Sequence, residues 1–157
     1  MIKDSGERTQ FDTGAVRDMR KGKGRCDLMP LEVIAEILDD VVIRDIAMFA
    51  QTGDYRDLSD AIIHFSNVRK WNLAETMLET SIQYEEGANK YGENNWQKGL
   101  PTWCYIDSAV RHYLKWLRGD TDESHDRAFV WNLLCCMWEV KRENDAGDGC
   151  REKVRNK

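Results

Sequence analysis

Apolar residues recur at helical spacing along most of the chain, and this pattern predicts a mainly α-helical fold. The first such stretch begins after Pro30, a residue that suits the first position of a helix, and extends to Phe49. The segment Thr52-Gly53-Asp54 ends it. We expect one continuous helix here, whose apolar face contains Leu31, Ile34, Ala35, Leu38, Val41, Val42, Ile46 and Phe49.

A second helical stretch starts near Leu58 and keeps its apolar spacing as far as Trp71. The same spacing continues from Leu73 to Glu86. The pattern therefore predicts either one long helix or two helices that are separated at Trp71-Asn72.

Two more helices are expected in the second half of the chain. Thr102 is a candidate N-cap for the first of them, and Gly119 ends it. Between them, apolar residues at i, i+3, i+4, i+7, i+8 and i+11 from Ile106 to Leu117 lie on one face. Either Asp122 or Ser124 can cap the last helix. Its apolar face is expected to contain Phe129, Val130, Leu133, Leu134, Met137 and Trp138.

The two ends of the chain have a different composition. Residues 1–29 contain four glycines, a weak strand alternation at 8–12 and a turn sequence at 21–24, so we expect an extended arm with a short β-hairpin. Residues 144–157 are polar and are expected to form a flexible tail. The sequence thus predicts a single helical ligand-binding domain over 1–143, with four to five helices and a short extended or β-hairpin N-terminal arm.

Length, charge and cysteine content exclude several classes of protein. A chain of 157 residues suits one domain, and its net charge of −5 argues against a general binder of duplex DNA or of membrane surfaces. No apolar run approaches the roughly 20 residues of a membrane span, and the first ten residues do not resemble a signal peptide. The five cysteines are odd in number and lack metal-ligand spacing, which favours a reducing cytoplasm over a disulfide framework.

The helix that follows Thr102 has a basic line opposite its apolar face. Arg111, Lys115 and Arg118 are spaced i, i+4 and i+7, so they lie together and are candidates for binding phosphate. The alternative is a solvated face in which Asp107 pairs with Arg111 at i+4.

The loop Asn94-Asn95-Trp96 is a second candidate, flanked by Tyr84, Tyr91 and Trp103. Asparagine amides can read the edge of a base, and aromatic rings can stack on its face. Alternatively, the loop is a tight turn in which asparagine adopts left-handed backbone and tryptophan packs. By contrast, Trp131 and Trp138 are expected in the helical core or at an interface.

A magnesium-dependent nucleotide hydrolase would need several carboxylates that converge on the metal ion. The E-x-x-E pattern of helical pyrophosphohydrolases does not occur in this chain, and neither does a P-loop, a G-x-G-x-x-G segment or a Ser-His-Asp elbow. We therefore expect no catalytic residue, no metal and no cofactor. The carboxylates that remain as candidates are Glu85, Glu86, Asp107 and Glu123, or the crowded Glu36, Asp39 and Asp40.

Several segments resemble a phage-borne family of dATP/dGTP diphosphohydrolase-like proteins. The similar segments are 84–99, 105–112, 125–132, 12–18 and 24–28, so the resemblance extends over most of residues 1–140.

Within this wider group, the chain is similar to the anti-Thoeris sponge proteins of phages, the first Thoeris anti-defence family, and residues 1–6 contribute to the likeness. The resemblance implies a protein that binds cyclic ADP-ribose isomers made by bacterial TIR-domain enzymes and holds them without cleavage. It also implies binding of CBASS cyclic oligonucleotides by some members, assembly as dimers and hexamers, and action in the cytoplasm of the infected bacterium.

The leading hypothesis is therefore a non-catalytic protein that sequesters a cyclic nucleotide. Cations neutralise the diphosphate, asparagines supply polar contacts and an aromatic ring stacks. The predicted ligand-binding residues are Tyr84, Asn94, Asn95, Trp96, Arg111, Lys115 and Arg118.

Two alternatives stay open. One is a magnesium-dependent dATP/dGTP pyrophosphohydrolase, in which Glu85, Glu86 and Asp107 lie near the metal and His112 or His125 assists. The other is a helical oligomerisation module whose tryptophans anchor an interface.

Overall fold

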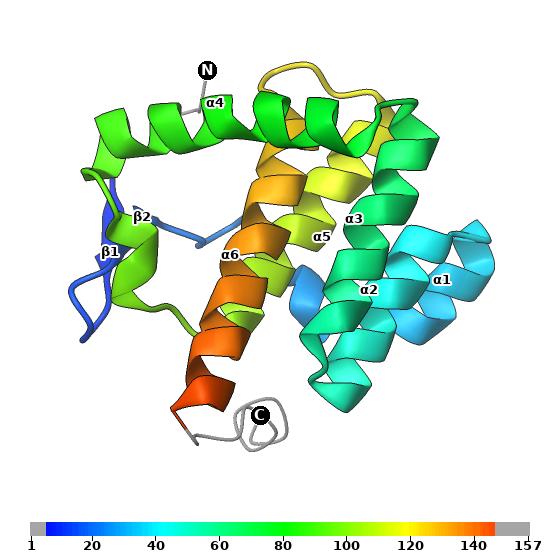
Figure 1. Cartoon of the computed structure of the whole chain (residues 1–157), viewed down its shortest axis with the longest axis horizontal. Helices are drawn as coiled ribbons and strands as arrows, with labels where there is room; N and C mark the ends of the chain where they lie inside the picture. The colour runs from blue at the N-terminus through cyan, green and yellow to red at the C-terminus, as the bar shows by residue number, and fades with distance from the viewer. Residues whose placement is uncertain (1–5, 147–157) are drawn as a thin grey trace.

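The computed structural model describes residues 6–146, and within this range it contains six α-helices, two short 3-10 helices and a two-stranded sheet (Figure 1). The mainly helical fold with an N-terminal β-hairpin is thus confirmed. The α-helices are α1 (Leu31–Leu38), α2 (Val41–Thr52), α3 (Tyr55–Arg69), α4 (Leu73–Tyr91), α5 (Thr102–Arg118) and α6 (His125–Asp145). The smaller elements are β1 (Arg8–Gln10), β2 (Val16–Asp18), η1 (Cys26–Leu28) and η2 (Asn95–Lys98).

The stretch after Pro30 forms two helices, so the prediction of one continuous helix was wrong. Asp39 adopts left-handed backbone with φ 49°, and the Asp40 side chain accepts a hydrogen bond from the backbone N–H of Ile43 at the start of α2. An N-cap carboxylate of this kind satisfies a donor that the helix itself leaves unpaired. The apolar spacing runs through the break because both helices turn an apolar face to the same core.

The alternative left open at Trp71-Asn72 is decided in favour of two helices. Lys70 ends α3 in left-handed backbone, and Asn72 begins α4 with a capping box in which Asn72 and Glu75 bond each other's backbone N–H groups. At α5, Pro101 occupies the N-cap position, so Thr102 is the first helical residue and not the cap. Ser124 precedes α6 without a capping hydrogen bond from its side chain.

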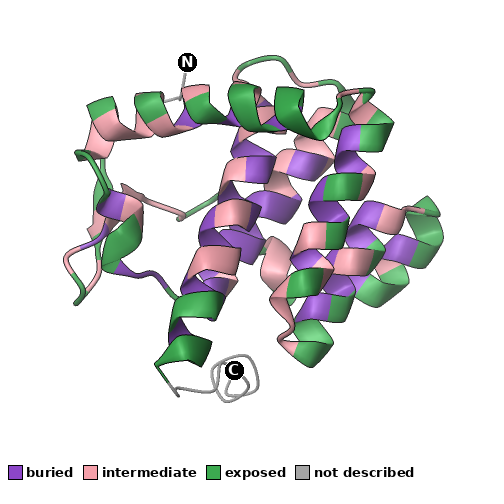
Figure 2. Ribbon diagram, viewed as in Figure 1, coloured by how far each residue is buried: buried purple, intermediate pink, exposed green. Residues whose placement is uncertain are grey.

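The apolar core lies between α2, α3, α5 and α6, whose facing sides carry most of the buried residues (Figure 2). The ring of Phe65 on α3 is fully buried and meets Tyr113 and Trp116 of α5 and Phe129 of α6 edge-on. Helix α4 crosses the end of the bundle and packs mainly on α6 (Figure 1).

The N-terminal arm folds as the sequence predicts. Strands β1 and β2 pair antiparallel, with Arg8 opposite Asp18, and the Asn95 side chain bonds the backbone of Val16. The arm is thereby fastened to η2. Helix α6 continues to Asp145, and the rest of the predicted tail, from residue 147 on, lies outside the described residues. In the described part of the chain, no helix combines the length and apolarity needed to cross a membrane.

Candidate functional site

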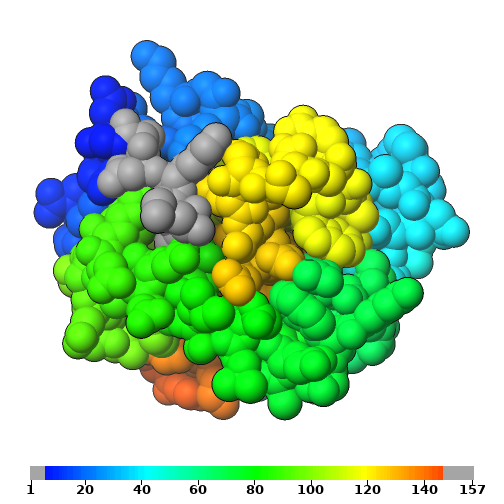
Figure 3. Space-filling model, turned by 90° about the horizontal axis from the view of Figure 1, so that it is seen from above, coloured from blue at the N-terminus to red at the C-terminus, as the bar shows by residue number. Residues whose placement is uncertain are grey.

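A cavity of about 460 Å³ lies between the N-terminal arm, α4, η2, α5, α6 and the loop at 119–124. Figure 3 looks onto the face of the molecule to which the arm, α4 and this loop all contribute. The volume falls in the range of about 300–1,000 Å³ that is usual for small-ligand sites. The cavity is therefore large enough to be a binding site for a small molecule.

Basic side chains outnumber acidic ones in the wall of this cavity. The three carboxylates are Asp18, Asp122 and Glu123. The five cations are Arg17, Arg20, Lys23, Arg111 and Lys115. A chain with a net charge of −5 thus concentrates positive charge in one cavity, which suits a small anion such as a phosphate ester.

Arg17 of β2 connects the arm to both central helices. Its Nη2 donates to Oδ1 of Asn132 on α6 at 2.8 Å and to Oγ of Ser108 on α5 at 3.2 Å. The guanidinium also lies over the rings of Tyr105 and Trp131. These contacts hold the positive charge in one position, so it is oriented before any ligand arrives.

Arg111 has a mainly structural set of partners. Its guanidinium pairs with the fully buried carboxylate of Asp107, which is the i+4 pairing that the sequence left open. It also donates to the backbone carbonyls of Lys23 and Gly24, each at 3.1 Å. Asp107 in turn accepts a hydrogen bond from the backbone N–H of Cys26 at 2.7 Å. This network fixes the turn that carries Lys23 into the cavity wall.

Lys23 and Lys115 form no ion pair with any carboxylate between residues 6 and 146, although both line the cavity. Burial lowers the pKa of the Lys23 amine from its usual value. These two ammonium groups are the cations best placed to meet an anionic ligand without first losing a protein partner.

Two hydrogen-bond donors in the cavity wall have no acceptor among the described residues. They are Nε1 of Trp131 and Nη1 of Arg20, and both atoms are buried. A buried donor without an acceptor costs about 1–3 kcal/mol, so each favours a bound acceptor. Trp131 packs against the core, as expected, and it also lines the cavity.

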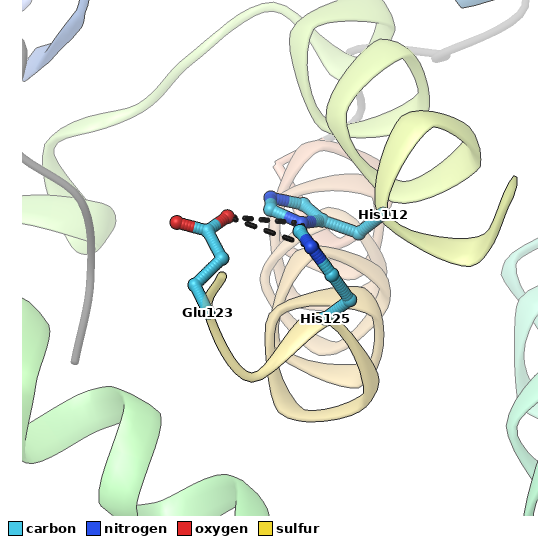
Figure 4. A group of neighbouring side chains, drawn as sticks. All are labelled: His112, Glu123 and His125. Carbon is cyan, nitrogen blue, oxygen red and sulfur yellow. Dashed lines mark hydrogen bonds and ion pairs between the residues drawn. The ribbon is translucent and has the colours of Figure 1, made fainter. Parts of the chain in front are cut away.

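His112, Glu123 and His125 meet at one end of the cavity (Figure 4). The two Nδ1 atoms are 2.9 Å apart, and Oε1 of Glu123 lies 3.3 Å from Nδ1 of His112 and 3.6 Å from Nδ1 of His125. Nε2 of His125 lies 2.7 Å from Oδ1 of Asp122. Burial, reinforced by the charge of neighbouring His125 and Arg111, lowers the pKa of His112 to about 3, so this imidazole is neutral near pH 7.

The structure divides the seven predicted ligand-binding residues into three groups. Arg118 lies outside both described hollows and pairs with Asp120 on the surface. Tyr84 and Asn94 line a second hollow of about 380 Å³ that shares several wall residues with the first. The residues that line the main cavity are Asn95, Trp96, Arg111 and Lys115.

All three members of the predicted loop also have clear structural roles. Asn94 adopts left-handed backbone with φ 59°, as in the tight-turn interpretation. The Asn95 amide accepts from N–H of Val16 at 3.0 Å and donates to its carbonyl at 2.9 Å. Trp96 packs edge-on against Tyr84 and Trp138.

The carboxylates proposed for a hydrolase do not assemble. Asp107 is fully buried and paired with Arg111, whereas Glu85 is exposed beside the second hollow. Among residues 6–146, the groups of histidines and carboxylates close enough to share an ion are His112-Glu123-His125 and Asp120-Asp122-His125. The interpretation that places Glu85, Glu86 and Asp107 around one magnesium ion is therefore wrong.

Arg17, Arg20 and Lys23 are the cations of the cavity wall that sequence reasoning missed. One signal was present, because four of the seven residues from Arg17 to Lys23 are basic in an otherwise acidic chain. Nothing in the linear order, however, indicated that this arm would fold against α5 and α6.

Comparisons with known proteins give one match. No curated protein and no solved structure matches the chain. A family model described as dATP/dGTP diphosphohydrolase, N-terminal, matches residues 60–149, which include α4, α5, α6 and the loop at 119–124. This match extends over more than half of the 157 residues. The chain therefore belongs to the dATP/dGTP diphosphohydrolase N-terminal family.

Proposed function

We propose that this protein binds a phosphate-bearing nucleotide in the 460 Å³ cavity and sequesters it without cleaving it. The observation that carries the proposal is the convergence of five cations on this one cavity, from the N-terminal arm and from α5. Lys23 and Lys115 supply charge for the phosphates, and the donors of Arg20 and Trp131 supply directional contacts.

The aromatic part of a nucleotide also has partners in this wall. The aromatic residues Tyr91, Trp96 and Trp131 line the cavity. Aromatic rings can stack on any nucleotide base. A ligand with both phosphate and base therefore matches the wall better than a bare anion does.

The pairing of Asp107 with groups of the protein itself favours sequestration over hydrolysis. Asp107, the acid nearest in sequence to the basic line, is already neutralised by Arg111 and by a backbone N–H. A sequestering protein needs affinity for its ligand but no catalytic carboxylate, so it can function while Asp107 is bonded to Arg111 and Cys26.

The resemblance to anti-Thoeris sponge proteins narrows the ligand class. We assign the chain a cyclic ADP-ribose isomer as ligand, with CBASS cyclic oligonucleotides as a second class. On the same resemblance it acts as a homodimer or hexamer in the cytoplasm of the infected bacterium.

Hydrolysis of dATP or dGTP is the second candidate function, and the family match favours it. In that case the protein would release a nucleoside monophosphate and pyrophosphate, whereas sequestration returns the ligand unchanged. The two functions therefore differ in the material that is recovered.

The decisive experiment measures that material. The protein is incubated with a cyclic ADP-ribose isomer or with dATP and magnesium, freed of unbound nucleotide, and denatured by heat. Intact cyclic nucleotide in near-stoichiometric amount is the expected result. Recovery of dAMP and pyrophosphate would instead establish the hydrolase, and absence of any retained nucleotide would refute binding.

Lysine substitutions locate the site. Lys115→Met and Lys23→Met are expected to weaken retention by about tenfold each, because each removes one charge-assisted contact worth about 1.5 kcal/mol. The matched controls are Lys141→Met and Lys21→Met, which change exposed lysines outside the cavity wall and leave retention unchanged. Equal nucleotide affinities in all four variants would refute the proposal that the nucleotide binds in this cavity. Arg111→Ala is a weaker test, since it also breaks the buried pair with Asp107.

A further inference from the structure

Three potential ligand atoms from α5, α6 and the preceding loop point at one another at the end of the cavity (Figure 4). They are Nδ1 of His112, Nδ1 of His125 and Oε1 of Glu123, and their separations are 2.9, 3.3 and 3.6 Å. The family match and the nucleotide-binding proposal assign no role to this cluster.

These separations are those of atoms that share a metal ion. Imidazole nitrogens and carboxylate oxygens bind Zn²⁺ at about 2.0–2.2 Å, and a tetrahedral arrangement at that length sets neighbouring ligand atoms about 3.4 Å apart. The three observed distances bracket this value. No backbone movement is needed to bring the three groups around an ion.

Asp122 gives His125 the tautomer that a metal ligand requires. An ionised carboxylate can only accept, so in the tautomer that this contact favours the ring carries its proton on Nε2, 2.7 Å from Oδ1 of Asp122. Nδ1 of His125 then carries a free lone pair directed toward His112. A carboxylate that holds the far side of a histidine ligand in this way is a regular feature of metal sites.

With His125 in this tautomer, Nδ1 of His112 is the donor in the 2.9 Å contact between the two Nδ1 atoms. Binding of an ion at Nδ1 of His112 moves this proton to Nε2 of the same ring, so no net charge leaves the imidazole. Two nitrogen ligands disfavour Mg²⁺ and Ca²⁺, which prefer oxygen, and favour zinc and its neighbours in the first transition row.

We propose that His112, Glu123 and His125 bind one divalent transition-metal ion of the zinc class. Asp122 orients the His125 ring through its Nε2 atom, on the side away from the ion. Three protein ligands leave a coordination position open, and His112 and Glu123 both line the cavity. The open position thus faces the space in which a ligand oxygen would lie. Metal binding is measurable without any nucleotide, so it stands or falls separately from the proposed function.

Cobalt(II) is the probe, because its visible absorption reports ligand type and geometry. Titration of the full chain with Co²⁺ is expected to produce d–d bands that saturate at one ion per chain. Added Zn²⁺ should displace the cobalt and abolish the bands. Absence of saturable bands, or a strong near-ultraviolet band of thiolate-to-cobalt charge transfer, would overturn the site, since the latter would place the ion on cysteine.

Substitutions identify the ligands. His112→Gln and Glu123→Gln are expected to weaken Co²⁺ binding by about a hundredfold or more, and Asp122→Asn by about 10–100-fold, as for other residues behind a ligand. His64→Gln is the control, because His64 lies on α3, pairs with Asp45 and is the third of the three histidines. Circular dichroism verifies that each variant is folded.

None of the substituted side chains is fully buried, because the fully buried His125 is left unchanged. Retention of tight binding in either His112→Gln or Glu123→Gln would refute the proposal, and so would its loss in His64→Gln.

Discussion

The two sides of helices α5 and α6 are built on opposite principles. On the side toward α3, the rings of Phe65, Tyr113 and Phe129 pack against one another. On the side toward the arm, Ser108 and Asn132 are just as buried but carry polar groups that Arg17 satisfies. The same two helices therefore supply an apolar core on one face and the wall of a polar cavity on the other.

The difference shows where this molecule depends on long-range partners. An apolar side chain is stabilised by whatever apolar surface covers it, whereas a buried polar group needs one particular partner at hydrogen-bond distance. On the cavity side several of these partners are distant along the chain: Cys26 and Asp107 are 81 residues apart, and Arg17 and Asn132 are 115 apart. The cavity side therefore depends more than the apolar side on specific partners that lie far away in the sequence.

The largest expected effect is a loss of folding stability from a substitution on the apolar side. Phe65→Ala removes a fully buried ring and is expected to lower the free energy of unfolding by about 3–5 kcal/mol, measured by urea denaturation. Val68→Ala on the same helix is the control, because Val68 is 48% exposed and its loss should stay within about 0.5 kcal/mol. Molecules of Phe65→Ala that remain folded should keep their nucleotide affinity. A selective loss of affinity would mean that the two sides are not separate.

A somewhat smaller effect is expected on the cavity side, where Arg111→Met leaves the Asp107 carboxylate buried without its countercharge. We expect a loss of about 3 kcal/mol in urea denaturation, together with weaker nucleotide retention because the turn carrying Lys23 is released. Arg118→Met is the matched control on the same helix, and it should change neither property, since Arg118 is exposed. Full stability in Arg111→Met would show that the buried pair contributes nothing to the cavity wall.

The smallest effect, when it is counted per pH unit, concerns pH and the neutral imidazole of His112. Its pKa falls from 6.5 to about 3 on folding, so between these values the unfolded chain binds more protons than the folded one. Stability is then constant above about pH 6.5 and decreases as the pH falls toward 3, by up to about 1.4 kcal/mol per pH unit from this one group.

His112→Gln, compared with the unchanged chain by urea denaturation in EDTA, should reduce this slope between pH 6 and 4 and leave the slope between pH 7 and 8 as it was. Equal slopes in the acidic range would show that His112 is protonated in the folded chain.

Predictions from the sequence were most accurate for elements with strong periodicity. The apolar faces of α5 and α6 and the hairpin of the arm follow from residue spacing and turn chemistry alone. The break between α1 and α2 was missed, because apolar spacing does not report a two-residue interruption capped by Asp40. Among candidate site residues, the basic line indicated Arg111 and Lys115 as cavity residues but also included Arg118, since spacing alone cannot tell which end of a helix face is covered.

By itself, then, the sequence determined the helical class, the positions of α5 and α6, the hairpin and the likeness to a family of nucleotide enzymes. These features are local: they depend on residues within a few turns of one another or on matched stretches of chain. Tertiary structure alone decided that Arg17 and Lys23 would line the same cavity as Lys115, and that His112 would meet Glu123 and His125. These contacts depend on how separate elements pack. Burying a polar side chain costs free energy unless its partner, here distant in the sequence, forms a hydrogen bond with it.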